Sequence, residues 1–391
     1  CATDPVRIDP VALTQDLVRC PSVTPEEGGA LTLLAGLLDR AGFEVHRPVF
    51  SSPGTPDVEN LYARIGTGHP CLVFAGHTDV VPPGDVARWQ DPPFSGALHE
   101  GVLYGRGACD MKAGVAAAVA AAVNHVTEHG LTTGSIAFLI TGDEEGPAVN
   151  GTVKLLEWAQ ARGERFDACV LGEPTNPSVM GEMMKIGRRG SLTGRLTVHG
   201  RQGHVGYPHL ALNPINALIR LLTALMKTPI DAGTRYFDAS TLAVTTVDTG
   251  NPATNVIPGE TRATFNIRFN DLWTPETLAG EVRRRLDSAG AEAPFTLVFD
   301  PTNSVSFLTE PGPFVDLVRA AVQAETGRSP ALSTSGGTSD ARFIQAYCPV
   351  IEFGVVGKTM HAIDECVAVA DIETLTRIYR RIIAAFLARC G

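Results

Sequence analysis

The sequence of 391 residues is long enough for two domains of ordinary size or one large domain. Hydrophobic residues make up 44% of it, and its 40 Gly and 27 Pro are too few for a low-complexity chain, so a mainly disordered or fibrous protein is excluded. Asp and Glu (42) outnumber Lys and Arg (32). The resulting net charge of -10 repels phosphate groups and argues against a nucleic-acid partner.

The cysteine pattern indicates the redox environment of the protein. Eight cysteines are scattered without a CxxC pair, so we expect reduced, mostly buried thiols, as in a cytosolic protein. The longest apolar stretch, residues 113–123, is shorter than the about 20 residues that a membrane span needs. The chain also opens without a basic and apolar leader, so we expect a cytoplasmic protein that contacts no membrane. The cysteines are Cys1, Cys20, Cys71, Cys109, Cys169, Cys348, Cys366 and Cys390.

Residues 24–42 predict a well-bounded helix. Thr24 can cap a helix that begins at Pro25, with Glu27 reaching back to complete a capping box. Leucines at spacings of three and four residues then form an apolar face, and Gly42 ends the helix.

Four apolar runs predict the strands of a sheet. They cover Cys71–Ala75, Ser135–Thr141, Ala168–Leu171 and Pro349–Val356, and each ends in glycine and polar residues. Continuous apolar runs of this length are typical of strands that are buried on both faces, as in a parallel sheet. We therefore expect an α/β catalytic domain with a mostly parallel central sheet.

The pattern changes between the third and fourth of these runs. Strands there alternate apolar and polar residues, which indicates a sheet with one solvated face. The order of elements is β-α-β-β-α-β, as in a ferredoxin-like unit. We expect an inserted α+β domain at 188–302 that interrupts a larger domain formed by 1–187 and 303–391. The predicted elements are strands at 192–198, 241–247, 262–269 and 295–299, helices that start at Asn213-Pro214 and Thr274-Pro275, and helices of the larger domain near 312–326 and 371–389.

Acids and histidines follow the apolar runs of the larger domain. His77 and Asp79 follow the first run, Asp143-Glu144-Glu145 the second, Glu173 the third and His361 the fourth. The carboxyl ends of strands in an open α/β sheet form the ligand crevice, so we expect these loops to converge. One histidine after an apolar strand is more often an ordinary loop residue, but the repeated placement outweighs that interpretation.

A fifth loop, residues 105–112, opens the alanine-rich helix and places Asp110 at its positive end. Two imidazoles with carboxylates suit Zn²⁺ or a similar first-row ion better than Ca²⁺. Two ions about 3.5–4 Å apart need a shared carboxylate, and five protein ligands can hold them. Adjacent Glu144 and Glu145 cannot easily point the same way, so one can bind metal while the other faces the attacking water. The sequence therefore predicts a two-metal hydrolase.

Four of these motifs, in this order, resemble those of the M20 metallopeptidase family of two-zinc amidohydrolases. The resemblance covers essentially the whole chain and implies a zinc-peptidase-like catalytic domain with an inserted dimerisation and lid domain. Two further stretches are similar to bacterial members that act on a succinylated diamino acid. The family motifs are residues 76–82, 105–112, 142–146 and 172–175, and the two further stretches are 185–192 and 333–340.

The resemblance implies the metal ligands residue by residue. His77 and Glu173 would bind one zinc, Glu145 and His361 the other, and Asp110 would bridge both. It implies two Zn²⁺ per subunit, with Co²⁺ as a substitute.

The resemblance also implies roles for neighbours of these ligands. Glu144 would be the general base, and Asp79 would orient His77 through its other ring nitrogen. The peptide bond after Asp110 is cis in the family. Cys109 stands where alanine is usual, a departure that leaves the ligand set intact.

The inserted domain is expected to complete the site across a homodimer. The resemblance implies that His204 reaches the active site of the neighbouring subunit and stabilises the oxyanion. The remaining histidines lack such context and are assigned no role. Four further positions match family residues that hold the carboxylates and amides of the substrate, and these are Arg188, Asn255, Arg268 and Thr338.

The implied reaction is hydrolysis of the succinyl amide of N-succinyl-LL-2,6-diaminopimelate. It would release succinate and the free diamino acid for lysine and cell-wall precursor synthesis. A related deacylase of acetylornithine or another N-acyl amino acid would share the metal chemistry. A relative that binds metal without catalysis is the alternative from another class, and the presence of Glu144 beside a full ligand set argues against it.

Overall fold

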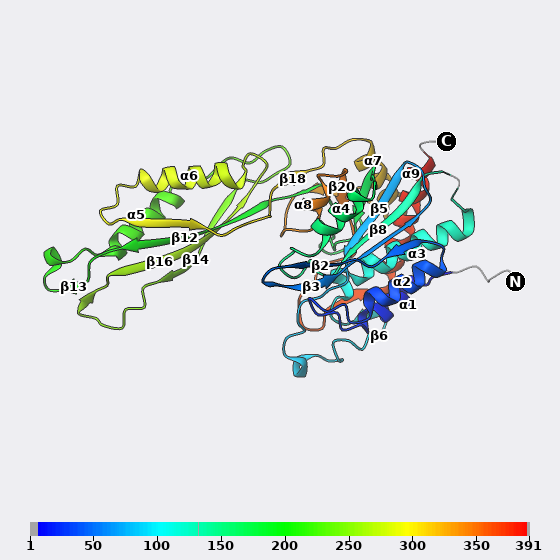
Figure 1. The fold of residues 1–391 in the computed structure, drawn as a ribbon, viewed down its shortest axis with the longest axis horizontal. Helices are drawn as coiled ribbons and strands as arrows, with labels where there is room; N and C mark the ends of the chain where they lie inside the picture. Colours follow the sequence, from blue (N-terminus) through cyan, green and yellow to red (C-terminus); the bar gives the residue numbers. More distant parts are fainter. Residues whose placement is uncertain (1–6, 132, 389–391) are drawn as a thin grey trace. The chain divides into compact units, whose positions relative to one another are not determined.

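The computed structural model describes residues 7–131 and 133–388, and these form two compact units (Figure 1). Unit 1 contains the described residues up to Ile186, Thr309–Ser333, and those from Ser339 onward. Unit 2 contains Gly187–Leu308 and the short segment Thr334–Thr338. Unit 2 is therefore an insertion in the chain of unit 1.

Unit 1 is built on a sheet of eight strands in which parallel and antiparallel pairs are mixed. β5, β8, β9 and β20 form its parallel centre, as the sequence predicts. β1 and β4 add an antiparallel edge, and β10 continues the other side antiparallel to β20. In spatial order the strands are β1 (Glu44–His46), β4 (Leu61–Ile65), β8 (Ser135–Thr141), β5 (Cys71–His77), β9 (Ala168–Leu171), β20 (Val350–Glu352), β10 (Met183–Lys185) and β19 (Ala331–Ser333).

The register of the parallel strands brings their carboxyl ends to one edge. His77 of β5 lies opposite Thr141 of β8, and Ala75 of β5 lies opposite Leu171 of β9. Glu352 of β20 lies opposite Leu171 in turn. The loops that follow these strands thus leave the sheet side by side, which confirms the expected convergence.

Helices cover both faces of this sheet (Figure 1). α3 and α9 pack against each other on one side, together with α1 and α7, and α4 packs with α8 on the other. Both faces of β5 and β8 are consequently buried along their whole length, which is why their sequences are continuous apolar runs. The helices of unit 1 are α1 (Pro10–Val18), α2 (Ala30–Arg40), α3 (Ala113–His129), α4 (Thr152–Ala161), α7 (Pro313–Thr326), α8 (Ala341–Ile344) and α9 (Val369–Leu387).

Helix α2 begins later than the sequence predicts. It starts at Ala30, and the carboxylate of Glu27 accepts hydrogen bonds from the main chain of its first turn. Thr24 does not cap it, because its hydroxyl donates to Asp79 (2.7 Å). The predicted start at Pro25 is therefore wrong, since a long-range hydrogen bond occupies the side chain that the local pattern assigned to the cap. The predicted end of the helix is confirmed.

Unit 2 has the predicted β-α-β-β-α-β order around a four-stranded antiparallel sheet. In space the sheet runs β14-β16-β12-β17, so the first and third strands in chain order pair at its centre. The two helices start where the sequence predicts, and Asn213 and Thr274 cap them by accepting main-chain N–H groups. The elements are β12 (Gly190–His199), α5 (Pro214–Met226), β14 (Thr241–Asp248), β16 (Glu260–Phe269), α6 (Pro275–Asp287) and β17 (Phe295–Phe299).

The two faces of this sheet differ, as the alternating sequence predicts. Phe265 and Ile267 of β16 point into a core shared with the leucines of α5 and α6. The other face is polar, and there Asn266 donates to the hydroxyls of Ser191 and Thr193 (both 3.0 Å). Unit 2 thus has a hydrophobic core of its own.

Short strand pairs complete the fold. In unit 1, β2 (Val49–Ser52) pairs with β3 (Thr55–Glu59), and β6 (Ala97–His99), β7 (Val102–Tyr104) and β21 (Cys366–Ala368) form a small sheet. In unit 2, β11 (Gly187–Arg188) pairs with β18 (Phe307–Leu308), and β13 (Gly203–His204) pairs with β15 (Val256–Ile257). Within residues 7–131 and 133–388, no helix has the length and apolarity to cross a bilayer.

The cysteines are distributed as the sequence suggests. All six in the described part of the chain are free, and Cys71, Cys109, Cys169 and Cys348 are buried. Cys1 and Cys390 lie outside the described residues.

A close approach of helix α3 to the end of β9 provides a test of this packing. A Cβ atom at Gly114 would lie 2.3 Å from the carbonyl oxygen of Gly172, next to Glu173. We predict that Gly114→Ala lowers the free energy of unfolding by about 1–3 kcal/mol, as overpacking does. Gly280→Ala, in an exposed part of α6 with no atom within 4 Å of the new Cβ, should instead stabilise by about 0.5–1 kcal/mol. Urea unfolding followed by circular dichroism measures both changes, and equal effects would contradict the prediction.

Candidate metal centre

Asp110 lies between the two predicted histidine ligands. Its Oδ1 is 3.3 Å from Nε2 of His77, and its Oδ2 is 3.3 Å from Nε2 of His361. One carboxylate therefore presents one oxygen to each imidazole, which is the arrangement that a bridging ligand requires.

A second carboxylate accompanies each imidazole. Glu173 Oε1 is 3.6 Å from His77 Nε2, and Glu145 Oε1 is 2.8 Å from His361 Nε2. The ligand atoms of His77, Asp110 and Glu173 all lie within 4.8 Å of one another, and so do those of Asp110, Glu145 and His361. We call these the inner triad and the outer triad. The five side chains predicted from the sequence are thus brought together.

The local structure of each ligand follows from its place in the fold. His77 is the last residue of β5, and Glu173 is the second residue after β9, so both are held by the sheet. Asp110 lies in an irregular turn before α3, and its peptide bond to Met111 is cis, as expected. His361 lies nine residues beyond β20, is half-exposed, and has a positive φ of 59°.

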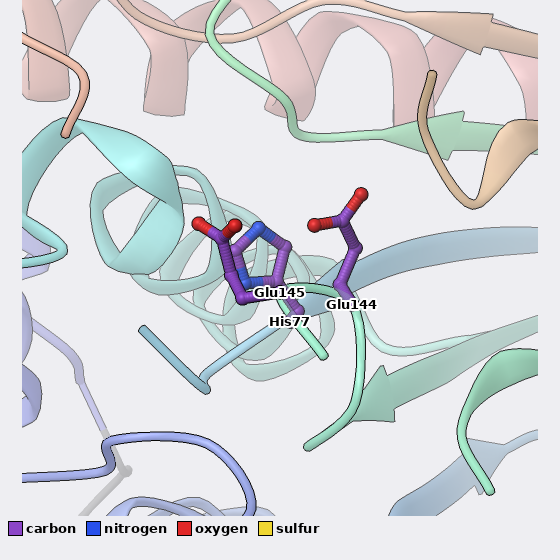
Figure 2. Close-up of side chains that lie close together, drawn as sticks. All are labelled: His77, Glu144 and Glu145. Carbon is purple, nitrogen blue, oxygen red and sulfur yellow. The ribbon is translucent and has the colours of Figure 1, made fainter. Parts of the chain in front are cut away.

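The adjacent acids Glu144 and Glu145 both face the cluster. Figure 2 shows their carboxylates beside the ring of His77, and ligand atoms of the three residues lie within 4.8 Å of one another. Only Glu145 also belongs to a triad with His361. Glu145 therefore presents its carboxylate to His361, and Glu144 presents its carboxylate to the space beside His77.

Asp79 holds the loop that carries these two acids. Its carboxylate accepts the N–H groups of Glu144 (3.3 Å) and Glu145 (3.0 Å), in addition to the hydroxyl of Thr24 (2.7 Å). Nδ1 of His77 donates to the main-chain carbonyl of Asp79 (2.9 Å), whereas the carboxylate of Asp79 is 3.6 Å from this nitrogen. Asp79 thus touches His77 through the backbone and the acids through its side chain.

The concentration of charge shifts the pKa values of the inner groups. Burial lowers the pKa of His77, but the hydrogen bond with Asp110 and the charge of Glu173 outweigh burial and raise it well above its usual value. Burial raises the pKa of Asp110, but hydrogen bonds with both histidines hold it below its usual range. The two groups therefore form an ion pair.

The pKa values of His361 and Glu144 are both raised. Hydrogen bonds with Asp110 and Glu145 raise the pKa of His361 to about 10. Burial, and then the charge of Glu173, raise the pKa of Glu144 well above its usual value. The imidazoles occupy the place of cations among the acids, so a metal ion must displace protons from them.

Two buried acids beside the cluster were given no role from the sequence. Asp340 is fully buried, and burial raises its pKa. Glu365 is buried next to Asp110 and accepts its N–H. An acid in a stretch of mixed polarity has no local signal that separates a buried position from a solvated one.

The residues predicted to contact substrate all lie in unit 2, as does His204. His204 is exposed at the end of β13, and Asn255 is its neighbour, because its carbonyl accepts the N–H of Val205 (3.0 Å). Nδ1 of His204 accepts the N–H of Gly206 (3.0 Å). This bond leaves the ring proton on Nε2, where it can be donated.

The predicted arginines lie on the strands of unit 2. Arg188 in β11 is buried and donates to the carbonyl of Gly337 (3.1 Å), which is next to Thr338. Arg268 in β16 is half-buried, and burial together with the charge of Arg189 lowers its pKa. This part of unit 2 therefore concentrates positive charge.

The fold and this cluster define a metal-dependent hydrolase: a parallel sheet with imidazoles and carboxylates at its carboxyl edge, interrupted by an α+β unit. The model of peptidase family M20/M25/M40 matches residues 73–385, and the chain belongs to this family. The resemblance inferred from the motifs is thereby confirmed.

The chain is similar to curated proteins over nearly its whole length. Succinyl-diaminopimelate desuccinylase of Methylobacterium nodulans is 68% identical over 379 residues, which are 96% of each chain. Succinyl-diaminopimelate desuccinylase of Methylorubrum extorquens is 66% identical over 379 residues, which are 96% of this chain and 98% of that one.

Solved structures confirm the fold class. Aminopeptidase PepT from Bacillus cereus aligns with a TM-score of 0.79 at 18% identity, over 97% of this chain and 98% of its own. The M20 family metallo-carboxypeptidase Sso-CP2 from Sulfolobus solfataricus aligns with a TM-score of 0.74 at 17% identity, over 97% and 99%. At such identities the likeness concerns the fold alone.

The displaced protons provide a test of the cluster. Because His361 keeps its proton up to about pH 10 in the metal-free protein, we predict that the apparent affinity for Co²⁺ rises about tenfold per pH unit between pH 6 and 8. Calorimetry in buffers of different ionisation enthalpy should show proton release on binding. The His361→Gln protein should release fewer protons, and an affinity independent of pH would contradict the prediction.

Proposed function

We propose that this protein hydrolyses N-succinyl-LL-2,6-diaminopimelate to succinate and LL-2,6-diaminopimelate. The observation that carries the proposal is the identity of 65–68% to curated desuccinylases over nearly the full length of both chains. The cluster at the edge of the sheet supports it, because its residue types suit hydrolysis of an amide.

The five clustered residues fit a pair of Zn²⁺ or Co²⁺ ions. Each triad combines one imidazole with two carboxylates whose ligand atoms lie within 4.8 Å of one another, which matches the ligand preference of zinc, and Asp110 belongs to both triads. His77 and Glu173 would hold one ion with Asp110, and Glu145 and His361 would hold the other. When bound, the ions supply Lewis acidity that lowers the pKa of water and polarises a carbonyl group.

Glu144 is the general base of the proposed reaction. It lies beside His77 but outside the outer triad, so its carboxylate is left to accept a proton from the attacking water. As the water oxygen bonds to the succinyl carbonyl carbon, Glu144 takes the proton and then passes it to the amine nitrogen when the C–N bond breaks. Asp79 supports this step by holding the N–H groups of Glu144 and Glu145.

Arginines of unit 2 can bind the several carboxylates of this substrate, although the protein as a whole is acidic. A guanidinium group binds a carboxylate with two parallel hydrogen bonds, and of the two arginines Arg188 is buried and Arg268 is half-buried. Asn255 and Thr338 supply neutral polar groups for the remaining carboxylate and amide atoms.

We propose a homodimer formed through unit 2 in which His204 acts on the partner's site. β14 is an edge strand with most of its residues exposed, so its unpaired main-chain groups are available to a second copy. Nε2 of His204 carries a proton, which suits it to stabilise an oxyanion. Free thiols and a biosynthetic reaction support a cytoplasmic location.

The function is tested by comparing two substrates with and without a chelator. We expect the Co²⁺- or Zn²⁺-loaded protein to hydrolyse N-succinyl-LL-2,6-diaminopimelate with a kcat/KM at least about tenfold higher than for N-acetylornithine. The reason is that an acetyl group lacks the carboxylate of a succinyl group, so the protein groups that bind this carboxylate would be left without a partner. The chelator should abolish both activities. A preference for N-acetylornithine would identify the related deacylase instead.

Substitution of the adjacent acids separates their roles. Glu144→Gln should lower kcat at least about 10²-fold with nearly unchanged metal content, because it removes the base and leaves the ligands. Glu145→Ala should lose metal instead. Atomic absorption after dialysis measures the metal content, and equal loss in both variants would show that the roles are assigned wrongly.

A complementation experiment tests the shared site. Mixing Glu144→Gln and His204→Ala chains, each inactive alone, should restore activity, because a heterodimer contains one site with Glu144 from one chain and His204 from the other. Mixing the His204→Ala chain with a chain that carries both substitutions should restore nothing. Absence of recovery despite demonstrated subunit exchange would contradict a role for His204 in the partner's site.

A further inference from the structure

Glu365 is a fully buried acid that the proposed reaction does not use. It lies four residues after His361, immediately before the small strand β21. Its carboxylate accepts the N–H groups of Gly107 (2.9 Å), Cys109 (3.0 Å) and Asp110 (3.1 Å). It therefore holds the main chain of the loop that presents Asp110 to the two histidines.

Arg106 is the charged partner of Glu365. Its Nη1 donates to Glu365 Oε2 at 2.8 Å, and its side chain is almost completely buried. The neighbours of the carboxylate given above are all donors, so both of its oxygens serve as acceptors. A buried ion pair of this kind is costly unless further hydrogen bonds support it. Here Glu365 accepts three main-chain N–H groups and both Nη groups of Arg106 have acceptors, whereas its Nε is buried without one among the described residues.

Arg106 also binds the loop that carries the second histidine. Its guanidinium donates to the main-chain carbonyls of His361 (3.3 Å) and Ala362 (3.1 Å). In the opposite direction, the N–H of Gly105 donates to the carbonyl of Glu365 (2.8 Å). The loops of Asp110 and His361, about 250 residues apart in the sequence, are thus bound to each other by side chains from both.

The loop of His361 needs such support. His361 and Asp364 have positive φ angles of 59° and 57°, in the left-handed region that residues other than glycine adopt only at a cost in free energy. The carbonyls of His361 and Ala362 accept from Arg106, and the side chain of Asp364 accepts the N–H of Gln90 (2.8 Å). These contacts select one conformation of a loop that its own residues do not favour.

The two triads differ in how much they depend on this pair. His77 and Glu173 follow directly from central strands of the sheet, and the sheet positions them. His361 is half-exposed and far from the end of its strand. Release of the Arg106–Glu365 pair should therefore displace His361 relative to Asp110 while leaving His77 and Glu173 in place.

We propose that Glu365 and Arg106 are positioning residues that set the placement of His361 relative to Asp110, and thereby the affinity of the outer triad for its metal ion. This inference rests on the ligand assignment of the proposed function. It assigns no chemical step to either residue.

The test is the binding of Co²⁺ to the Glu365→Gln protein, followed by calorimetry and by the visible absorption of the bound ion. Glutamine preserves size but offers one accepting oxygen in place of two. One of the two ions should bind about 10- to 100-fold more weakly, and the other should change less than about threefold. The activity lost at low Co²⁺ should return at high Co²⁺ with an unchanged KM.

A His361→Gln background identifies the affected site. In that background only the inner triad remains, so adding Glu365→Gln should change the remaining Co²⁺ affinity less than about threefold. Glu164→Gln is the matched control, because it breaks the ion pair with Arg64 at the opposite edge of the same sheet and should lower the melting temperature without altering Co²⁺ binding. Arg106→Lys, which keeps the charge but loses the forked contact, replaces Glu365→Gln if the latter does not fold.

The outcomes separate this inference from the proposed function. Wild-type protein that fails to bind two Co²⁺ ions would overturn the ligand assignment itself. If the wild type binds two ions and Glu365→Gln weakens both equally, or neither, the positioning role is wrong. An equal loss in the His361→Gln background would also overturn it, because the effect would then lie on the inner triad.

Discussion

The site depends on one electrostatic constraint, namely the gathering of acids at the carboxyl edge of a buried parallel sheet. Asp110, Glu144, Glu145 and Glu173 gather there around the imidazoles of His77 and His361. Burial and the charge of Glu173 raise the pKa of Glu144, because negative charges close together in a buried site are unfavourable. Such a site favours divalent cations, because they neutralise the acids that the strand ends bring together.

Other buried acids at the same edge accept hydrogen bonds from the main chain of the loops. Loops that leave a sheet lose the hydrogen bonds of the ladder, and their buried N–H groups need new acceptors. Asp79 accepts those of Glu144 and Glu145, and Glu365 accepts that of Asp110 and of its neighbours. The acids near the cluster thus divide into those that face the imidazoles and those that hold the loops. The acids that hold the loops thereby fix the positions of the acids that face the imidazoles.

The proposed catalytic residues of the cluster and the proposed substrate contacts fall in separate compact units. The acids and imidazoles of the cluster all belong to unit 1, whereas Arg188, Arg268 and His204 belong to unit 2. Unit 2 has its own hydrophobic core and a polar sheet face, so its side chains can vary without disturbing the sheet that positions the ligands. This division is consistent with a family in which one hydrolytic centre serves different substrates.

The sequence by itself determined the strands and the residues that follow them. Continuous apolar runs, as in β5 and β8, identify buried strands because burial on both faces leaves no room for polar residues. Helix starts marked by a local signal, such as Asn213-Pro214, were also predicted correctly. Only the tertiary structure decided that Thr24 bonds to Asp79 instead of capping a helix, and that Glu365 holds Asp110. Those partners lie 55 and 255 residues away in the chain, and local pattern carries no information about contacts that folding alone creates.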